Sequence, residues 1–191
     1  MTKLYAILLV PILLAGLSVT NSYSDDTILT LRLVHPDHDR ISFLQPSEVK
    51  IDKKDYEYFE LEKKNYWVSK KIELDITDMK DAKLQVITPP SKKEIEALSK
   101  THPNTSFSLE PSYNVTIILN KKGQEKFMKL TANNIMRRLA IIFEGRLLIA
   151  PIITKKISGD EVVISSLSSY DDATRLRDTI KNYSARSQKK Y

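Results

Sequence analysis

One short segment of the chain groups residue types that could bind a metal. His35–Asp39 holds two histidines and two aspartates around Pro36, and these are side chains that coordinate zinc. Pro36 forces an extended or turn backbone, and the next histidine, His102, is distant in sequence. We therefore interpret the segment as a polar turn and predict no metal site.

Other reactive residue types lack the partners that catalysis needs. No serine lies in a Gly-x-Ser-x-Gly turn, and the absence of cysteine excludes thiol chemistry and disulfides. Asp171 and Asp172 come at a predicted helix start, where carboxylates interact favourably with the helix dipole. Arg137 and Arg138 could bind an anion, but adjacent side chains point in different directions, so we do not expect both to bind one group. We predict no enzyme activity and no cofactor.

The charge of the chain is positive but dispersed. The net charge is +6, from 30 Lys and Arg against 24 Asp and Glu. The basic residues are interleaved with acids along the sequence, and no alternation of aromatic and basic residues suggests a surface on which bases could stack. We therefore predict a solvated basic surface and no nucleic-acid partner.

The first residues resemble a secretion signal. Lys3 is followed by an apolar stretch to Val19 that is shorter than the roughly 20 residues needed to span a bilayer. Small residues at Ser22 and Ser24 predict cleavage before Asp25, and an uncleaved N-terminal anchor is the alternative. We predict a periplasmic or otherwise extracytoplasmic protein with a signal peptide over residues 1–24.

The clearest pattern of secondary structure covers residues 113–181. Residues 113–119 alternate as a half-buried strand, and Asn120 is a predicted N-cap for a helix with an apolar stripe at Phe127, Leu130 and Ile135. Strands are predicted at 139–143, 146–150, 152–157 and 161–165, with hairpin turns at Glu144-Gly145 and at 158–160. Ser169 is the predicted cap of a closing amphipathic helix.

The residues before this stretch predict shorter elements. A strand is expected at 27–34, a polar segment at 41–65, and a strand at 66–68 in which Trp67 packs inside the fold. Thr77 is expected to cap a short turn through Ala82, and a strand follows at 83–88. Ser91 and Glu94 form a capping box for a short helix.

The spacing of motifs in the second half of the chain resembles a known family, the head of the first large periplasmic domain of SecD, an accessory subunit of the bacterial protein-export channel. The resemblance covers about seventy residues and is carried by Asn114-Val115-Thr116-Ile117, Gly123, Phe127, Leu130-Thr131, Asn134-Ile135, Arg137-Arg138-Leu139-Ala140-Ile141-Ile142, Gly145, Ala150-Pro151-Ile152-Ile153 and Asp172-Ala173. The chain departs from the family pattern at Met136, where Gly is usual, and at Glu144, where Asp is usual.

The resemblance implies an α+β domain with an antiparallel sheet, helices on one face and a ferredoxin-like β-α-β-β-β-α order. We predict a front half at 25–110 that completes the domain, a SecD-head-like domain at 111–183 and a basic tail at 184–191. The family implies a module that binds protein or unfolded polypeptide. An envelope structural or small-ligand-binding protein that reuses the fold is the alternative.

Four residues are the candidates for polypeptide binding: Ile149, Ala150, Pro151 and Ile152. An apolar run interrupted by a proline is typical of an edge strand, to which an extended peptide can add as a further strand. The alternative is that these residues fill the core and that Pro151 marks a bulge.

Overall fold

The computed structural model of the protein describes residues 27–44, 47–101 and 109–189. The predicted signal peptide at residues 1–24 lies outside these ranges. Among the described residues, no helix is both long enough and apolar enough to cross a membrane. The fold is α+β, as predicted, and its strands pair in antiparallel fashion.

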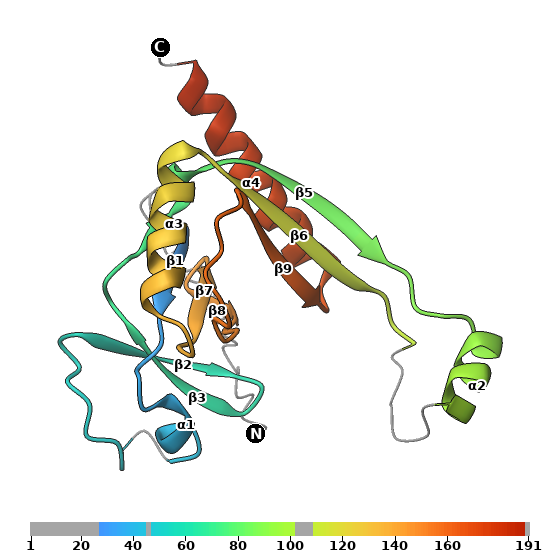
Figure 1. Ribbon diagram of the computed structural model, residues 1–191, viewed down its shortest axis with the longest axis horizontal. Helices are drawn as coiled ribbons and strands as arrows, with labels where there is room; N and C mark the ends of the chain where they lie inside the picture. Colours follow the sequence, from blue (N-terminus) through green and yellow to red (C-terminus); the bar gives the residue numbers. More distant parts are fainter. Residues whose placement is uncertain (1–26, 45–46, 102–108, 190–191) are drawn as a thin grey trace, which may run out of the picture.

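The strands are divided among three antiparallel sheets (Figure 1). The central sheet has the order β4-β1-β7-β8, with β4 at Leu74–Asp75, β1 at Leu29–Leu33, β7 at Leu139–Phe143 and β8 at Arg146–Ile149. The β2-β3 hairpin comprises Tyr56–Leu61 and Lys64–Ser69. The helix-covered sheet has the order β5-β6-β9, with bounds Met79–Ile87, Ser112–Leu119 and Glu161–Leu167.

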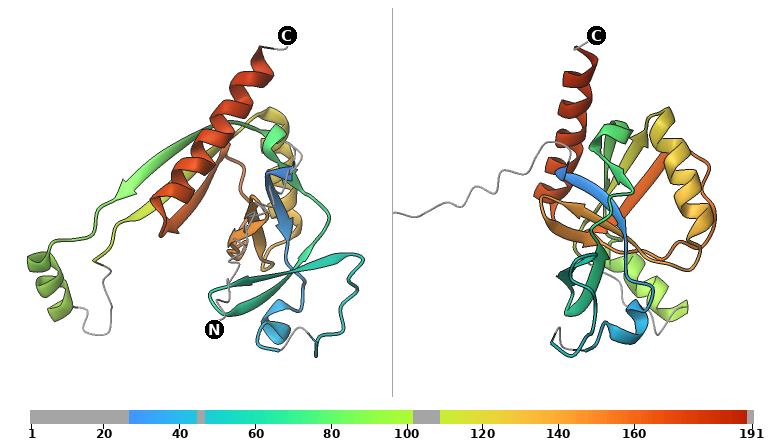
Figure 2. Two further views of the ribbon diagram at one scale, coloured as in Figure 1. Left: turned by 180° about the vertical axis from the view of Figure 1, so that it is seen from behind. Right: turned by 90° about the vertical axis from the view of Figure 1, so that its left-hand side faces the viewer.

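Four α-helices accompany the described strands: α1 (His38–Ile41), α2 (Lys92–Thr101), α3 (Lys121–Asn133) and α4 (Tyr170–Gln188). The C-terminal half therefore has the predicted order β6-α3-β7-β8-β9-α4. Helix α4 lies along the helix-covered sheet (Figure 2). Helix α2 buries none of its residues and stands at the far end of the long β5-β6 ribbon (Figure 1).

The central sheet is buried on both faces because its strand residues alternate between two apolar clusters. On one face, Leu31 and Ile141 belong to the large core, which also holds Phe127 of α3 and Leu176 of α4. On the other face, Ile142 belongs to a smaller cluster that the β2-β3 hairpin covers. All five residues of β7 are buried.

The start of α3 is held tightly against a 3-10 turn at Ile76–Asp78. The predicted cap Asn120 accepts a hydrogen bond from the Gly123 N–H at 2.9 Å, and its side-chain amide donates to the Thr77 carbonyl at 2.8 Å. A Cβ on Gly123 would lie 2.1 Å from the Asp78 carbonyl oxygen, so only glycine fits this contact. Asp75, not Thr77 as predicted, caps the 3-10 turn.

Left-handed backbone occurs at several non-glycine residues. Glu144 and Gly145 have φ of 49° and 71°, as a two-residue turn between β7 and β8 requires. Met136 has φ of 67°, which explains physically why glycine suits this position in the family pattern. Glu62 and Lys63, with φ of 50° and 61°, form the turn of the β2-β3 hairpin.

Some elements differ from the prediction. Residues 152–157 form only an isolated bridge at Ile152 and no strand, and β9 pairs with β6, so 158–160 does not join a hairpin. Ile135 lies beyond the end of α3 and is 50% exposed. Tyr56 and Tyr58 lie in β2, within a region predicted only as polar.

Candidate functional site

The four candidate residues follow the outer edge of the central sheet. Ile149 pairs with Ile141 at the end of β8, after a bulge. The chain then continues along β7, because the Leu139 N–H donates to the Pro151 carbonyl at 2.9 Å and the Ile153 N–H donates to the Arg137 carbonyl at 2.8 Å. These two bonds flank Ile152, so its own N–H and C=O face away from β7.

Burial divides the four residues into two pairs. Ile149 packs partly against the large core, and Ala150 is buried in the smaller cluster beneath the hairpin. Pro151 is exposed, and Ile152 is 39% exposed. The second pair is thus the part of the edge that a partner could reach.

A mainly apolar cavity of about 210 Å³ opens beside this exposed pair. It lies between α3, the segment after β8 and the start of β9, and its lining includes Phe127, Ile153 and Val163 as well as Pro151 and Ile152. Val163 is 53% exposed on β9. Val163 could not be recognised as a site residue from the sequence. The alternating pattern of β9 shows only that the Val163 side chain faces away from α4.

The two adjacent arginines point to different places, as expected. The Arg137 side chain donates to the Asn134 side-chain oxygen at 2.9 Å and to the Val34 carbonyl at 3.2 Å. The Arg138 side chain instead donates to the Ala150 carbonyl at 3.0 Å. Arg138 thereby holds the candidate edge in place, and the two guanidinium groups do not converge on one ligand.

The histidines near Pro36 have structural contacts. His38 is buried and stacks on Tyr66 with ring centroids 4.4 Å apart. Burial lowers the pKa of His38, and the charge of Arg138 lowers it further. The His35 ring accepts a hydrogen bond from the Asp37 N–H at 3.1 Å. Across the described residues, no three His, Cys, Asp or Glu side chains gather to hold a metal ion.

Asp172 ties the β7-β8 turn to the start of α4. Its N–H donates to the side chain of the cap Ser169 at 3.1 Å, and its carboxylate accepts from Arg146 at 2.6 Å and from Arg175 at 2.8 Å. Partial burial raises the pKa of Asp172, but the hydrogen bonds from the two arginines outweigh it and hold the pKa below its usual value. This carboxylate has a structural role.

Comparison with protein families gives a match over the second half of the chain. Residues 93–182 match the family model described as SecDF, P1 head subdomain. The matched range contains α3, the strands β6 to β9, and most of α4. The resemblance seen in the sequence is therefore confirmed, and residues 93–182 are similar to the SecDF P1 head subdomain.

The individual relatives are protein translocase subunits. The subunit SecDF of Thermus thermophilus is 39% identical over 62 residues, which are 32% of this chain and 8% of that protein. The subunit SecD of Acidaminococcus fermentans is 36% identical over 62 residues, or 15% of its length. The subunit SecD of Petrotoga mobilis is 32% identical over 68 residues, or 14% of its length. The chain thus corresponds to a small part of each relative.

Solved structures of SecDF are also similar. A structure described as a membrane component SecDF that enhances protein export covers 80% of this chain and 92% of that chain, with 17% identity and a TM-score of 0.35. A crystal structure of SecDF in a super-membrane-facing form covers 66% of this chain and 23% of that chain, with 18% identity and the same TM-score.

Proposed function

We propose that this protein is a non-enzymatic, extracytoplasmic module that binds unfolded or translocated polypeptide during protein export. The observation that carries the proposal is the match of residues 93–182 to the SecDF P1 head subdomain. Its relatives are protein translocase subunits, which supports a place on the outer side of the export channel.

The edge after β8 supplies a physical means of binding. A strand edge offers backbone N–H and C=O groups to an extended peptide, whatever the sequence of the peptide. Ile152 combines an outward-facing backbone with a partly exposed apolar side chain beside the 210 Å³ cavity. In this proposal the peptide adds as a further strand at Ile152 and places an apolar side chain in the cavity.

The test compares two lysine substitutions at isoleucines of similar exposure. Ile152 is 39% exposed at the proposed edge, and Ile87 is 37% exposed at the end of β5. Binding to a fluorescently labelled, permanently unfolded protein is measured by anisotropy, with thermal unfolding as a check on folding. We expect Ile152→Lys to weaken binding at least several-fold and Ile87→Lys to leave it unchanged. Equal affinities for both variants and the unsubstituted chain would refute the edge as the binding site.

A further inference from the structure

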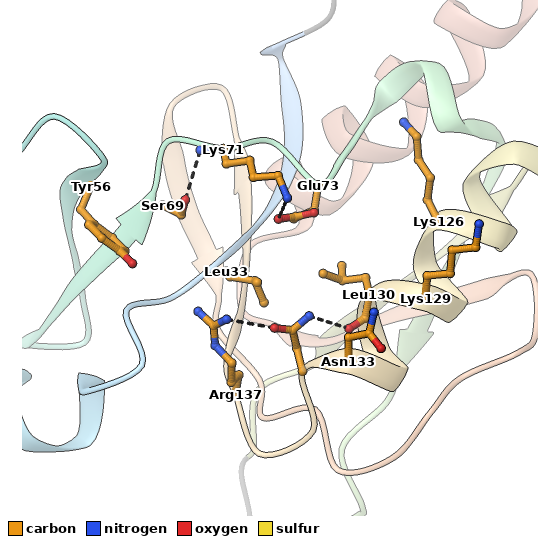
Figure 3. Close-up of a pocket in the computed structure, with 11 residues that line it drawn as sticks. Leu33, Tyr56, Ser69, Lys71, Glu73, Lys126, Lys129, Leu130, Asn133 and Arg137 are labelled. Atoms are coloured by element: carbon orange, nitrogen blue, oxygen red, sulfur yellow. Dashed lines mark hydrogen bonds and ion pairs between the residues drawn. The ribbon is translucent and has the colours of Figure 1, made fainter.

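A second cavity, of about 670 Å³, lies near the β4-β1 edge of the central sheet, which is the edge opposite β8. Figure 3 shows the residues that line it. Its walls come from the end of β1, the start of β2, the β3-β4 connection, and the C-terminal half of α3. Its lining includes Leu33, Lys71, Glu73, Lys129, Leu130 and Arg137. The volume is in the range of cavities that bind small molecules or short peptide segments.

β4 covers only part of its edge of β1, next to the cavity. β4 pairs with β1 only at Thr30 and Leu31, and the Glu73 N–H donates to the Leu31 carbonyl at 3.0 Å. Backbone groups alternate along a strand, so those of Leu33 face the same side as those of Leu31. β4 has no pair with Leu33, and Leu33 lines the cavity together with Lys71 and Glu73 of the β3-β4 connection (Figure 3).

The cationic side chains of this cavity are only partly neutralised. Lys71 pairs with Glu73 at 2.8 Å, and Lys126 pairs with the fully buried Asp78 at 2.7 Å. Lys129 and Arg137 pair with no carboxylate within the described part of the chain. The cavity wall therefore carries two positive charges that no acid of the described residues balances.

The guanidinium group of Arg137 is held in position before any ligand binds. Its two hydrogen bonds are to neutral oxygens, those of Asn134 and Val34, and Asn134 is itself fixed because its amide donates to the Leu130 carbonyl at 2.8 Å. Arginine carries five N–H donors, so these bonds leave three, of which the buried Nε has no partner. The hydrogen bond from the Asn134 side-chain amide to the Leu130 carbonyl also satisfies a free carbonyl at the C-terminal end of α3. It therefore reduces the partial negative charge at that end of the helix.

We propose that this cavity binds a carboxylate group, with Arg137 as its fixed partner and the exposed Lys129, on the wall formed by α3, as a more distant positive charge. The planar donor fork of arginine matches the geometry of a carboxylate, as it also matches that of a phosphate. The floor of the cavity is apolar at Leu33 and Leu130, which suits a carboxylate next to an aliphatic group. Two sources fit, an acidic residue of an extended peptide or a small organic acid, and the peptide source rests on the proposed function.

The experiment measures binding to the purified chain by isothermal titration calorimetry at low salt. One probe is a hexapeptide with blocked ends and a single glutamate between two leucines, and its match carries glutamine instead. Succinate is the small-acid probe, and inorganic phosphate is the competitor. We expect the glutamate peptide to bind at least tenfold more tightly than the glutamine peptide. Binding of succinate alone would identify the small acid as the source, and binding of the peptide alone would identify the peptide.

Variants assign the effect to the cavity. Arg137→Gln should weaken carboxylate binding about 10- to 100-fold, as the loss of a hydrogen bond to a charged group does. Lys129 is exposed, so Lys129→Gln should stay folded and weaken binding about two- to fivefold. Lys122→Gln, on the same helix but outside the cavity, is the matched control and should change nothing.

Three results would overturn the proposal: measurable and equal binding of the glutamate and glutamine peptides, full affinity in both folded cavity variants, or phosphate competing as well as a carboxylate. The residues tested here differ from those of the β8 edge. Suppose that Arg137→Gln weakens carboxylate binding but Ile152→Lys leaves the binding of unfolded protein unchanged. This result would support the carboxylate site and refute the β8 edge as the polypeptide-binding site. If Ile152→Lys weakens the binding of unfolded protein but Arg137→Gln leaves carboxylate binding unchanged, the β8 edge is supported and the carboxylate site is refuted.

Discussion

Replacing Gly123 by alanine should destabilise the protein, although alanine is the better helix former. The added Cβ would lie 2.1 Å from the Asp78 carbonyl oxygen, well inside the 3.0 Å that real Cβ atoms keep from their neighbours. The atom it meets is backbone, so it cannot turn away as a flexible side chain could. The start of α3 and the 3-10 turn must therefore move apart.

The size of the effect follows from what this movement disturbs. Asn120 joins the two elements through its N–H to the Asp78 carbonyl at 3.0 Å and through its amide to the Thr77 carbonyl at 2.8 Å. Weakening two such bonds costs about 1 kcal/mol each, and overpacking costs about 1–3 kcal/mol. The gain in helix propensity is at most about 1 kcal/mol. We expect a net loss of about 2–4 kcal/mol in the free energy of unfolding.

Urea unfolding followed by Trp67 fluorescence measures this loss, because Trp67 is the only tryptophan and is buried. Gly159→Ala is the matched control. The nearest atom to a Cβ at Gly159 is 4.0 Å away, so this variant should stay within about 0.5 kcal/mol of the unsubstituted chain. A Gly123→Ala protein as stable as its parent would show that α3 does not approach the 3-10 turn this closely.

Two further predictions concern the backbone and the pH dependence of stability. Met136→Gly should raise the free energy of unfolding by about 0.5–1 kcal/mol, because Met136 is 74% exposed and has φ of 67°. The neighbouring substitution Ile135→Gly is the control and should lower the free energy of unfolding. The opposite order of the two variants in urea unfolding would contradict this prediction. Stability should fall as the pH drops below about 6.5, the ordinary pKa of histidine, because the unfolded chain takes up a proton there while burial of His38 holds its folded pKa lower. The urea midpoint should fall less between pH 7.5 and pH 5 for His38→Phe than for the unsubstituted chain. The rest of the fall is due to His35, whose pKa burial also lowers. An equal fall in both proteins would exclude His38 as a cause of the pH dependence.

The order of elements in the second half was predictable because hydrophobic period and capping residues change together along the chain. Asn120 and Ser169 cap α3 and α4 as their side chains suggest. The β2-β3 hairpin could not be predicted in this way, because its turn uses Glu62 and Lys63 in a conformation that Asn and Gly favour.

The division into three sheets and the two cavities were not predictable from local patterns. An alternating strand shows which of its residues face a core, but not which strand it pairs with, and β9 pairs with β6 rather than with its neighbour in sequence. The different directions of Arg137 and Arg138 followed from their adjacency. The surroundings of Arg137 did not, because they combine α3 with residues about 65 to 100 positions earlier.

The pairing of β1 with β7 has a consequence for how the chain folds. Leu31 lies opposite Ile141, so about 110 residues must be closed into a loop before this ladder can form. Among the strands that the structure describes, the only other partner of β1 is β4, which pairs with it at two positions. During synthesis from the N-terminus, the apolar β1 therefore stays without its main partner until most of the protein has been made. We expect slow folding with a high contact order, in which the newly made chain exposes Leu29–Leu33 and depends on protection from aggregation until β7 arrives.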